Sequence, residues 1–190
     1  MIVVSDTTPL ISLMKIGQLQ LVNKLFGEIQ LPDAVFNELV SNPKFVSESK
    51  QIKESDFIHK VSVSDTKAVE LLRRSTGLDA GESEAIILSD MIDADLLLMD
   101  EAKGRQVAQQ MGIQLMGTIG LLLIANQEGY LTKEEILACI DILKNIEASH
   151  NNMRCPFLLY RKLRQRIPFQ QKAKLFAIGC AGIRFFYFTL

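Results

Sequence analysis

The sequence predicts an α/β protein in which helices cover both faces of a central parallel sheet, as a three-layer α/β/α sandwich, with a helical C-terminal extension. Short apolar runs alternate with longer stretches of helical periodicity, which is the pattern of a parallel sheet built from βαβ units. The run from Leu96 to Met99 is apolar throughout, as expected of a strand covered on both faces. The chain has 190 residues, and we place one domain at residues 1–150 and the extension at 151–190.

In the first half of the chain, three β-rich apolar runs predict strands at residues 2–4, 28–31 and within 57–63. Helical periodicity lies between them, at residues 10–26 with a break near residue 17, at 32–40 and at 46–55. Pro32 stands in the first helical turn, a position that proline favours. Asp65 is a good N-cap for a further helix that ends at Thr76–Gly77.

In the second half, helices are predicted at residues 80–92, 101–111, 118–127 and 132–146, and strands at 96–99 and 113–116. The helix at 132–146 begins with a capping box formed by Thr132 and Glu135. A final amphipathic helix is expected at residues 156–167, and its basic residues form either a solvated face or a surface for RNA.

The charge balance and the cysteine content limit the classes of protein to which the chain can belong. The chain has 21 Lys and Arg residues and 22 Asp and Glu residues, so its net charge is -1. This overall charge does not indicate a nucleic-acid-binding protein. A nucleic-acid partner stays open, because local patches matter more than the total charge. The three cysteines have no metal-binding spacing, and we interpret them as reduced thiols of a cytoplasmic protein. No basic segment precedes the first strand, so we expect no signal peptide.

The C-terminal tail, residues 175–190, is almost entirely apolar. It is shorter than the roughly 18 to 20 residues that a membrane span needs. We interpret it as a packing segment or an oligomer contact. A tail anchor and a poorly ordered chain end are the alternatives.

Polar side chains follow the predicted strands. Asp6 follows the first strand, Asp100 follows the run at 96–99, and Thr118 follows the run at 113–116. Since ligands of open parallel sheets bind beyond the carboxyl ends of the strands, these residues form a candidate site. The alternative for each is an N-cap. Pro9, as a first helical residue, would make Thr8 the cap and leave Asp6 free.

Three glutamates are further candidates. Glu84 shares a helix face with apolar residues at i+3, i+4 and i+7, whereas Glu82 points nearly the opposite way. Glu84 is therefore either a ligand or a paired structural carboxylate. Glu82 is either a ligand or a first-turn acid favoured by the helix dipole. Glu38 flanks an apolar stripe, and periodicity alone places it on the surface.

Several carboxylates at one edge of a sheet repel one another, and a divalent cation removes the conflict. Oxygen ligands without Cys or His suit Mg²⁺ or Mn²⁺, and such centres serve phosphoryl chemistry. The chain has no phosphate-binding loop, dinucleotide fingerprint or nucleophile elbow that would indicate another activity. A receiver-type or phosphatase domain is disfavoured, since no D-x-D follows the first strand.

Three stretches closely resemble an uncharacterised branch of the PIN domains that is related to VapC-type toxins. They are SDTTPLISLMKIGQLQLVNKLFGEIQLPDAVFNEL, LDAGESEAIILS and ADLLLMDEAKGRQVAQQMGIQLMGTIGLLL, within residues 1–146. The resemblance implies a Rossmann-like sandwich in which four acids bind Mg²⁺ or Mn²⁺ and cleave single-stranded RNA. By position these acids are Asp6, Glu38, Glu84 (with Glu82 beside it) and Asp100.

The resemblance also implies supporting residues and partners. Thr7 matches the hydroxyl residue that follows the first acid, Thr118 lies at the same edge, and Lys103 and Arg105 are candidates for RNA contacts. A cognate antitoxin and a homodimer are the implied protein partners. The alternative to a ribonuclease is an RNA-binding module with a weak or inactive site, because the third acid is Glu where VapC toxins usually carry Asp.

Overall fold

The computed structural model describes residues 1–43 and 46–149. Within them five parallel strands form one sheet in the order β3-β2-β1-β4-β5. The strands are β1 (Val3–Ser5), β2 (Ile29–Pro32), β3 (Ile58–Val61), β4 (Leu96–Leu98) and β5 (Leu115–Met116). The α/β prediction is confirmed. The predicted extension at 151–190, its basic helix and its apolar tail lie outside the described residues.

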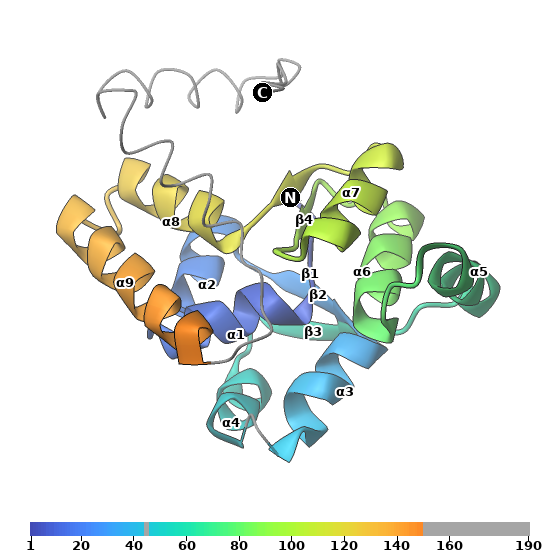
Figure 1. Ribbon diagram of the computed structural model, residues 1–190, viewed down its shortest axis with the longest axis horizontal. Helices are drawn as coiled ribbons and strands as arrows, with labels where there is room; N and C mark the ends of the chain where they lie inside the picture. Colours follow the sequence, from blue (N-terminus) through green and yellow to red (C-terminus); the bar gives the residue numbers. More distant parts are fainter. Residues whose placement is uncertain (44–45, 150–190) are drawn as a thin grey trace. The chain divides into compact units, whose positions relative to one another are not determined.

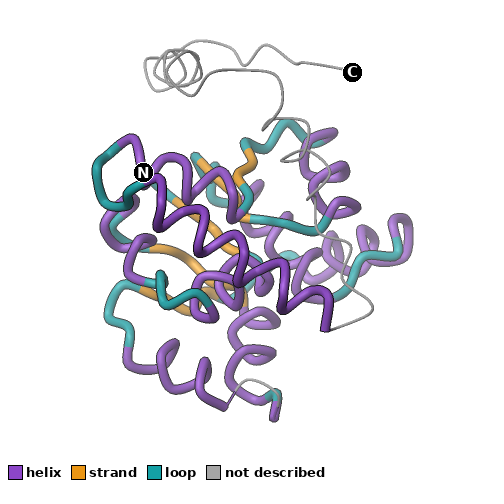
Figure 2. The backbone as a smooth tube through the Cα atoms, turned by 60° about the vertical axis from the view of Figure 1, so that its left-hand side comes forward, coloured by secondary structure: helices purple, strands orange, loops and turns teal. Residues whose placement is uncertain are grey.

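The helices connect these strands and form the two outer layers (Figures 1 and 2). In the described residues they are α1 (Thr7–Lys15), α2 (Gln20–Phe26), α3 (Asp33–Ser41), α4 (Val46–Glu54), α5 (Thr66–Thr76), α6 (Ala80–Met91), α7 (Ala102–Gln110), α8 (Thr118–Gln127) and α9 (Lys133–Ser149). Figure 1 shows α5, α6 and α7 on one side of the sheet and α1, α2, α8 and α9 on the other.

Helix α6 is the centre of its layer, because it packs against β1, β2 and β4 and also against α3, α5 and α7. Its apolar side chains, including Ile86 and Leu88, join Val4, Leu97 and Met99 of the sheet in one buried cluster. The apolar residues of β1 and β4 are thus covered by helices on both faces of the sheet. The uninterrupted apolar runs in the sequence predict this arrangement.

Most helix ends follow the predicted chemistry. The Asp65 carboxylate accepts a hydrogen bond from the Ala68 amide at 2.9 Å, and Gly77 ends α5 in the left-handed conformation that glycine tolerates. Thr132 and Glu135 form the predicted capping box. No helix in the described part of the chain is long and apolar enough to cross a membrane.

Two predicted helix starts and one predicted N-cap were wrong. Helix α1 begins at Thr7, so Asp6 and not Thr8 occupies the N-cap position. Pro32 is the last residue of β2 and precedes α3. Helix α8 begins at Thr118, as predicted, but its N-cap is Gly117 and not Thr118. In all three cases the chain turns from strand to helix within a residue, which leaves no separate cap segment to recognise in the sequence.

Candidate functional site

The strand order places a crevice between β1 and β4. From β1 the chain continues toward β2 on one side, and from β4 it continues toward β5 on the other. The loops after these two neighbouring strands therefore diverge, which is where open α/β sheets bind ligands. A cavity of about 270 Å³ lies there. It is lined by Asp6, Thr7, Thr8, Glu38, Asp79, Glu82, Glu101 and Lys103.

Asp6 is the most buried acid of the cavity, with 3% of its surface exposed. Its amide donates to the Leu98 carbonyl at 2.9 Å and so continues the pairing of β1 with β4. Although Asp6 is the N-cap residue of α1, its side chain makes no capping hydrogen bond. Burial raises the pKa of Asp6 to about 7; the Thr7 amide lowers it, and repulsion by Asp79, Glu82 and Glu38 raises it.

Glu38 extends from α3 to the cavity wall, although Glu38 is exposed to solvent. The Thr7 hydroxyl donates to its carboxylate at 2.7 Å. This hydrogen bond connects the first residue of α1 with the second turn of α3, so two residues far apart in sequence line the same wall. Periodicity alone placed Glu38 on the surface, and only the resemblance brought it to the site.

Glu82 lines the cavity from the first turn of α6. It forms a capping box with Asp79, in which the Glu82 amide donates to Asp79 at 2.8 Å and the Asp79 amide donates to Glu82 Oε2 at 3.0 Å. The second carboxylate oxygen, Oε1, is buried and has no hydrogen-bond partner. Burial raises the pKa of Glu82, and repulsion by Asp79 and Glu101 adds to the rise, whereas Lys103 lowers it.

Glu84 points elsewhere. Its Oε2 accepts a hydrogen bond from the Ala34 amide at 2.7 Å, which satisfies a backbone donor in the first turn of α3. Glu84 does not line the cavity. Of the two glutamates left open by the sequence, the structure therefore brings Glu82 and not Glu84 to Asp6.

Asp100 follows β4 as predicted, but both of its oxygens are engaged. They accept hydrogen bonds from the amide and the hydroxyl of Thr118, at 2.8 and 2.5 Å. Burial raises the pKa of Asp100, and the Thr118 hydrogen bonds and the Arg105 charge lower it. Asp100 holds the start of α8, and neither it nor Thr118 lines the cavity.

A family model described as DUF3368, PIN domain, matches residues 2–167 of the chain. The protein belongs to this PIN-domain family. PIN domains are generally nucleases and usually bind divalent metals. A search of curated proteins found no match to the chain.

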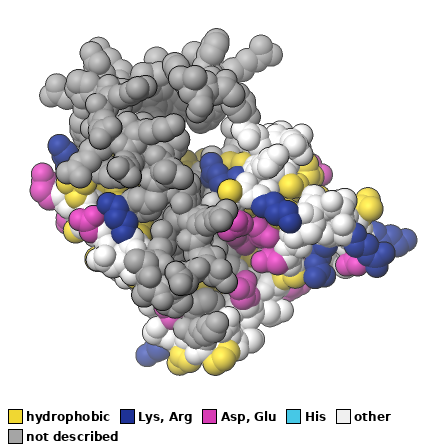
Figure 3. All heavy atoms as spheres, viewed as in Figure 1, with side chains coloured by type: hydrophobic (Ala, Val, Ile, Leu, Met, Phe, Trp, Pro, Cys, Tyr) yellow, Lys and Arg dark blue, Asp and Glu magenta, His cyan; other side chains and the backbone are white. Residues whose placement is uncertain are grey.

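Basic groups are few at the cavity of this PIN domain. Lys103 lines it, and its ammonium group donates to the Gly77 carbonyl at 2.9 Å. Arg105 is half-buried, donates to the Met99 carbonyl at 2.7 Å and does not line the cavity. On the face drawn in Figure 3, acidic side chains gather beside Lys and Arg side chains.

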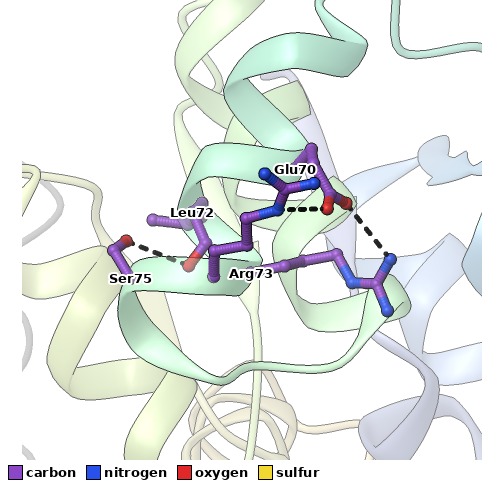
Figure 4. Close-up of polar contacts among 5 residues, drawn as sticks. Glu70, Leu72, Arg73 and Ser75 are labelled. Atoms are coloured by element: carbon purple, nitrogen blue, oxygen red, sulfur yellow. Dashed lines mark hydrogen bonds and ion pairs between the residues drawn. The ribbon is translucent and has the colours of Figure 1, made fainter.

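Helix α5 adds basic residues next to α6, and two of its arginines share one acid. Arg73 and Arg74 both pair with Glu70, at 3.6 and 2.6 Å. Figure 4 shows these contacts together with the hydrogen bond from the Ser75 hydroxyl to the Leu72 carbonyl. The arginines of α5 are thus held along their own helix, which leaves Lys103 as the cation that lines the described cavity.

Sequence reasoning missed two acids of the cavity, Asp79 and Glu101. The signal for Asp79 was present, because Asp79 and Glu82 have the spacing of a capping box. The sequence predicts Glu101 only as the first residue of a helix at 101–111. It occupies the N-cap position of α7 but makes no side-chain capping hydrogen bond.

The cavity fits a divalent cation by its chemistry. No three acidic, histidine or cysteine side chains stand close enough to hold an ion together within the residues that the structure describes. However, Mg²⁺ keeps several of its waters and takes only one or two carboxylates directly. The wall offers carboxylate oxygens, one of which is buried without a partner. Asp6, Glu38 and Glu82 are the candidate ligands that the structure brings together.

Proposed function

We propose that this PIN domain is a Mg²⁺- or Mn²⁺-dependent endoribonuclease that cleaves single-stranded RNA. The observation that supports it most is the acidic cavity at the β1–β4 crevice, where Asp6 is buried among carboxylates and has a pKa of about 7. Such a cluster is unfavourable by itself. A cluster of carboxylates is nevertheless what a binding site for a hard cation such as Mg²⁺ requires.

The residues of the cavity have separate roles in this proposal. Asp6, Glu38 and Glu82 would hold the cation, which would supply Lewis acidity for the attack of water on a phosphodiester. The Thr7 hydroxyl orients the Glu38 carboxylate. Lys103, at the cavity wall, would pair with a backbone phosphate. Water adds to phosphorus and the 3′ oxygen leaves with a proton, so the products carry a 5′-phosphate and a 3′-hydroxyl.

We further propose that the protein acts as the toxin of a toxin-antitoxin pair, with a cognate antitoxin and a homodimeric state. The support for these partners is the resemblance to VapC-type toxins. Co-expression with the protein encoded by a neighbouring gene would test it: a toxin arrests growth alone and the partner relieves the arrest.

The experiment for the activity compares cleavage of an end-labelled single-stranded RNA with Mg²⁺, with Mn²⁺ and with a chelator. We expect metal-dependent products in the wild type and their loss, by at least about a hundredfold, in Asp6→Asn. Glu54→Gln is the matched control, because Glu54 is an exposed acid of α4 that does not line the cavity. Equal traces of cleavage in the wild type and in Asp6→Asn would contradict the proposal.

A second candidate function is an RNA-binding module without turnover. It is favoured by the spacing of the acids, since no three of them form a ready-made metal site among the described residues, and by the engagement of both Asp100 oxygens with Thr118. Metal uptake measured by calorimetry together with RNA binding, but without cleavage, would establish this function.

A further inference from the structure

The carboxylate of Asp100 is closed off from the cavity. Its two oxygens accept from Thr118, and its Oδ1 lies against Gly117, where an added β-carbon would stand 2.6 Å away. The Asp100 side chain is 7% exposed and does not line the cavity. The two hydrogen bonds from Thr118 fix the orientation of this carboxylate, and in that orientation it does not face the cavity where an ion would lie.

The next residue, Glu101, has the opposite surroundings. It is exposed, it lines the cavity, and its side chain does not cap α7 although it stands at the N-cap position. An acid at an N-cap normally satisfies a backbone amide of the first turn. The Glu101 carboxylate is free of that role and faces the same space as Asp6 and Glu82.

Helix α7 also approaches Glu82 closely beside Glu101. Gly104 lies one turn along the helix, on the same face. An added β-carbon at Gly104 would stand 3.1 Å from Glu82 Oε1, the buried oxygen that has no partner. The first turn of α7 thus brings the Glu101 carboxylate and the unpartnered Glu82 oxygen to one part of the cavity wall.

From this geometry we propose that Glu101, and not Asp100, supplies the fourth carboxylate of the metal site, and that Asp100 is a positioning residue. This inference rests on the proposed metal-dependent function. Asp100 fixes the start of α8 against the end of β4 through Thr118. Because Glu101 is the next residue along the chain, that attachment also sets where the Glu101 backbone lies.

The test is Mn²⁺ titration by calorimetry on the full chain, with thermal unfolding of the metal-free protein as a second readout. Glu101→Gln should weaken Mn²⁺ binding by at least about tenfold and leave the melting temperature unchanged or higher, since one like charge is removed. Asp100→Asn should bind Mn²⁺ within about threefold of the wild type, because Asn can accept from the Thr118 amide and donate to its hydroxyl. Asp100→Ala should lower the melting temperature, and Asn should rescue it.

The outcomes separate this inference from the proposed function. If Asp100→Asn loses tenfold or more, or if Glu101→Gln binds as the wild type does, the inference is wrong even when Asp6→Asn has lost binding. A wild type that takes up no Mn²⁺, or an Asp6→Asn variant that binds as the wild type does, would overturn both. Glu54→Gln is the control for removing an exposed acid outside the cavity.

Discussion

Glu84 of α6 accepts a hydrogen bond from the Ala34 amide of α3 at 2.7 Å. The amide belongs to the first turn of α3, whose donors have no partner inside the helix. Helix α3 carries Glu38 into the cavity, and α3 and α6 pack closely. Glu84 therefore holds in place a helix that supplies a carboxylate to the site.

The first prediction concerns this contact. Glu84→Ala should lower the free energy of unfolding by about 1–2 kcal/mol, because a helix amide loses its acceptor. Glu84→Gln keeps an acceptor oxygen and should cost less than about half of that. Urea unfolding measures both. In Glu84→Gln, which still accepts from the Ala34 amide, Mn²⁺ calorimetry should show unchanged affinity. A Glu84→Gln variant that is stable but has lost its metal affinity would make Glu84 a ligand after all.

The fold was predictable because its strands are uninterrupted apolar runs and its helices are long and periodic. Residues 96–98, for example, are fully apolar and form the buried strand β4. Helix N-caps were less predictable than the helices themselves, because the partner of a first-turn amide can come from elsewhere in the chain. Thr118 donates its amide to Asp100, which lies 18 residues earlier. Local sequence patterns do not contain that contact.

The residues of the site were predictable only where the sequence carries a local signal for them. Asp6 was found because it follows a strand, and that is a local signal. The choice between Glu82 and Glu84 depended on Ala34, 50 residues away, whose amide engages Glu84. Asp100 stands where the strand-end rule places it, yet its carboxylate faces Thr118. The rule locates a backbone position and does not determine which way the side chain points.

The second prediction concerns pH. The pKa of Asp6 is about 7 in the folded protein against an ordinary value of 3.8. The folded state therefore binds more protons than the unfolded state between about pH 4 and 7, and the metal-free protein loses stability as the pH rises through that window. The loss is absent below about pH 4 and complete above about pH 8. It amounts to at most about 4 kcal/mol for Asp6.

Urea unfolding at about pH 5 and about pH 8 measures this effect. The wild type should lose more stability between the two values than Asp6→Asn, which has no charge to bury at this position. Glu82 and Asp100, whose pKa values are also raised, contribute in the same direction in both proteins. Added Mg²⁺ should restore stability at about pH 8 in the wild type only. Equal pH dependence in the two proteins would contradict the burial of a charged Asp6.

The third prediction concerns the hydrogen bond from Thr7 to Glu38. Thr7→Val keeps the shape of the side chain and removes the donor, so the Glu38 carboxylate is no longer oriented. Metal affinity should fall by about 10-fold, as for other residues that position a ligand. Thr7→Ser retains the hydroxyl and should bind metal as the wild type does. If Ser and Val behave alike, the hydroxyl has no role in the site.

The last prediction concerns the glycine that lies against Asp100. A β-carbon at Gly117 would stand 2.6 Å from Asp100 Oδ1, and that carboxylate cannot move without losing its bonds to Thr118. Gly117→Ala should therefore destabilise the protein by about 1–3 kcal/mol in urea unfolding. The matched control is Gly81→Ala in α6, where the nearest atom lies 3.4 Å away. It should be neutral or stabilising by up to about 1 kcal/mol, since alanine favours helix. Equal effects of the two substitutions would mean that Asp100 is free to leave Thr118, and its exclusion from the cavity would then lose its support.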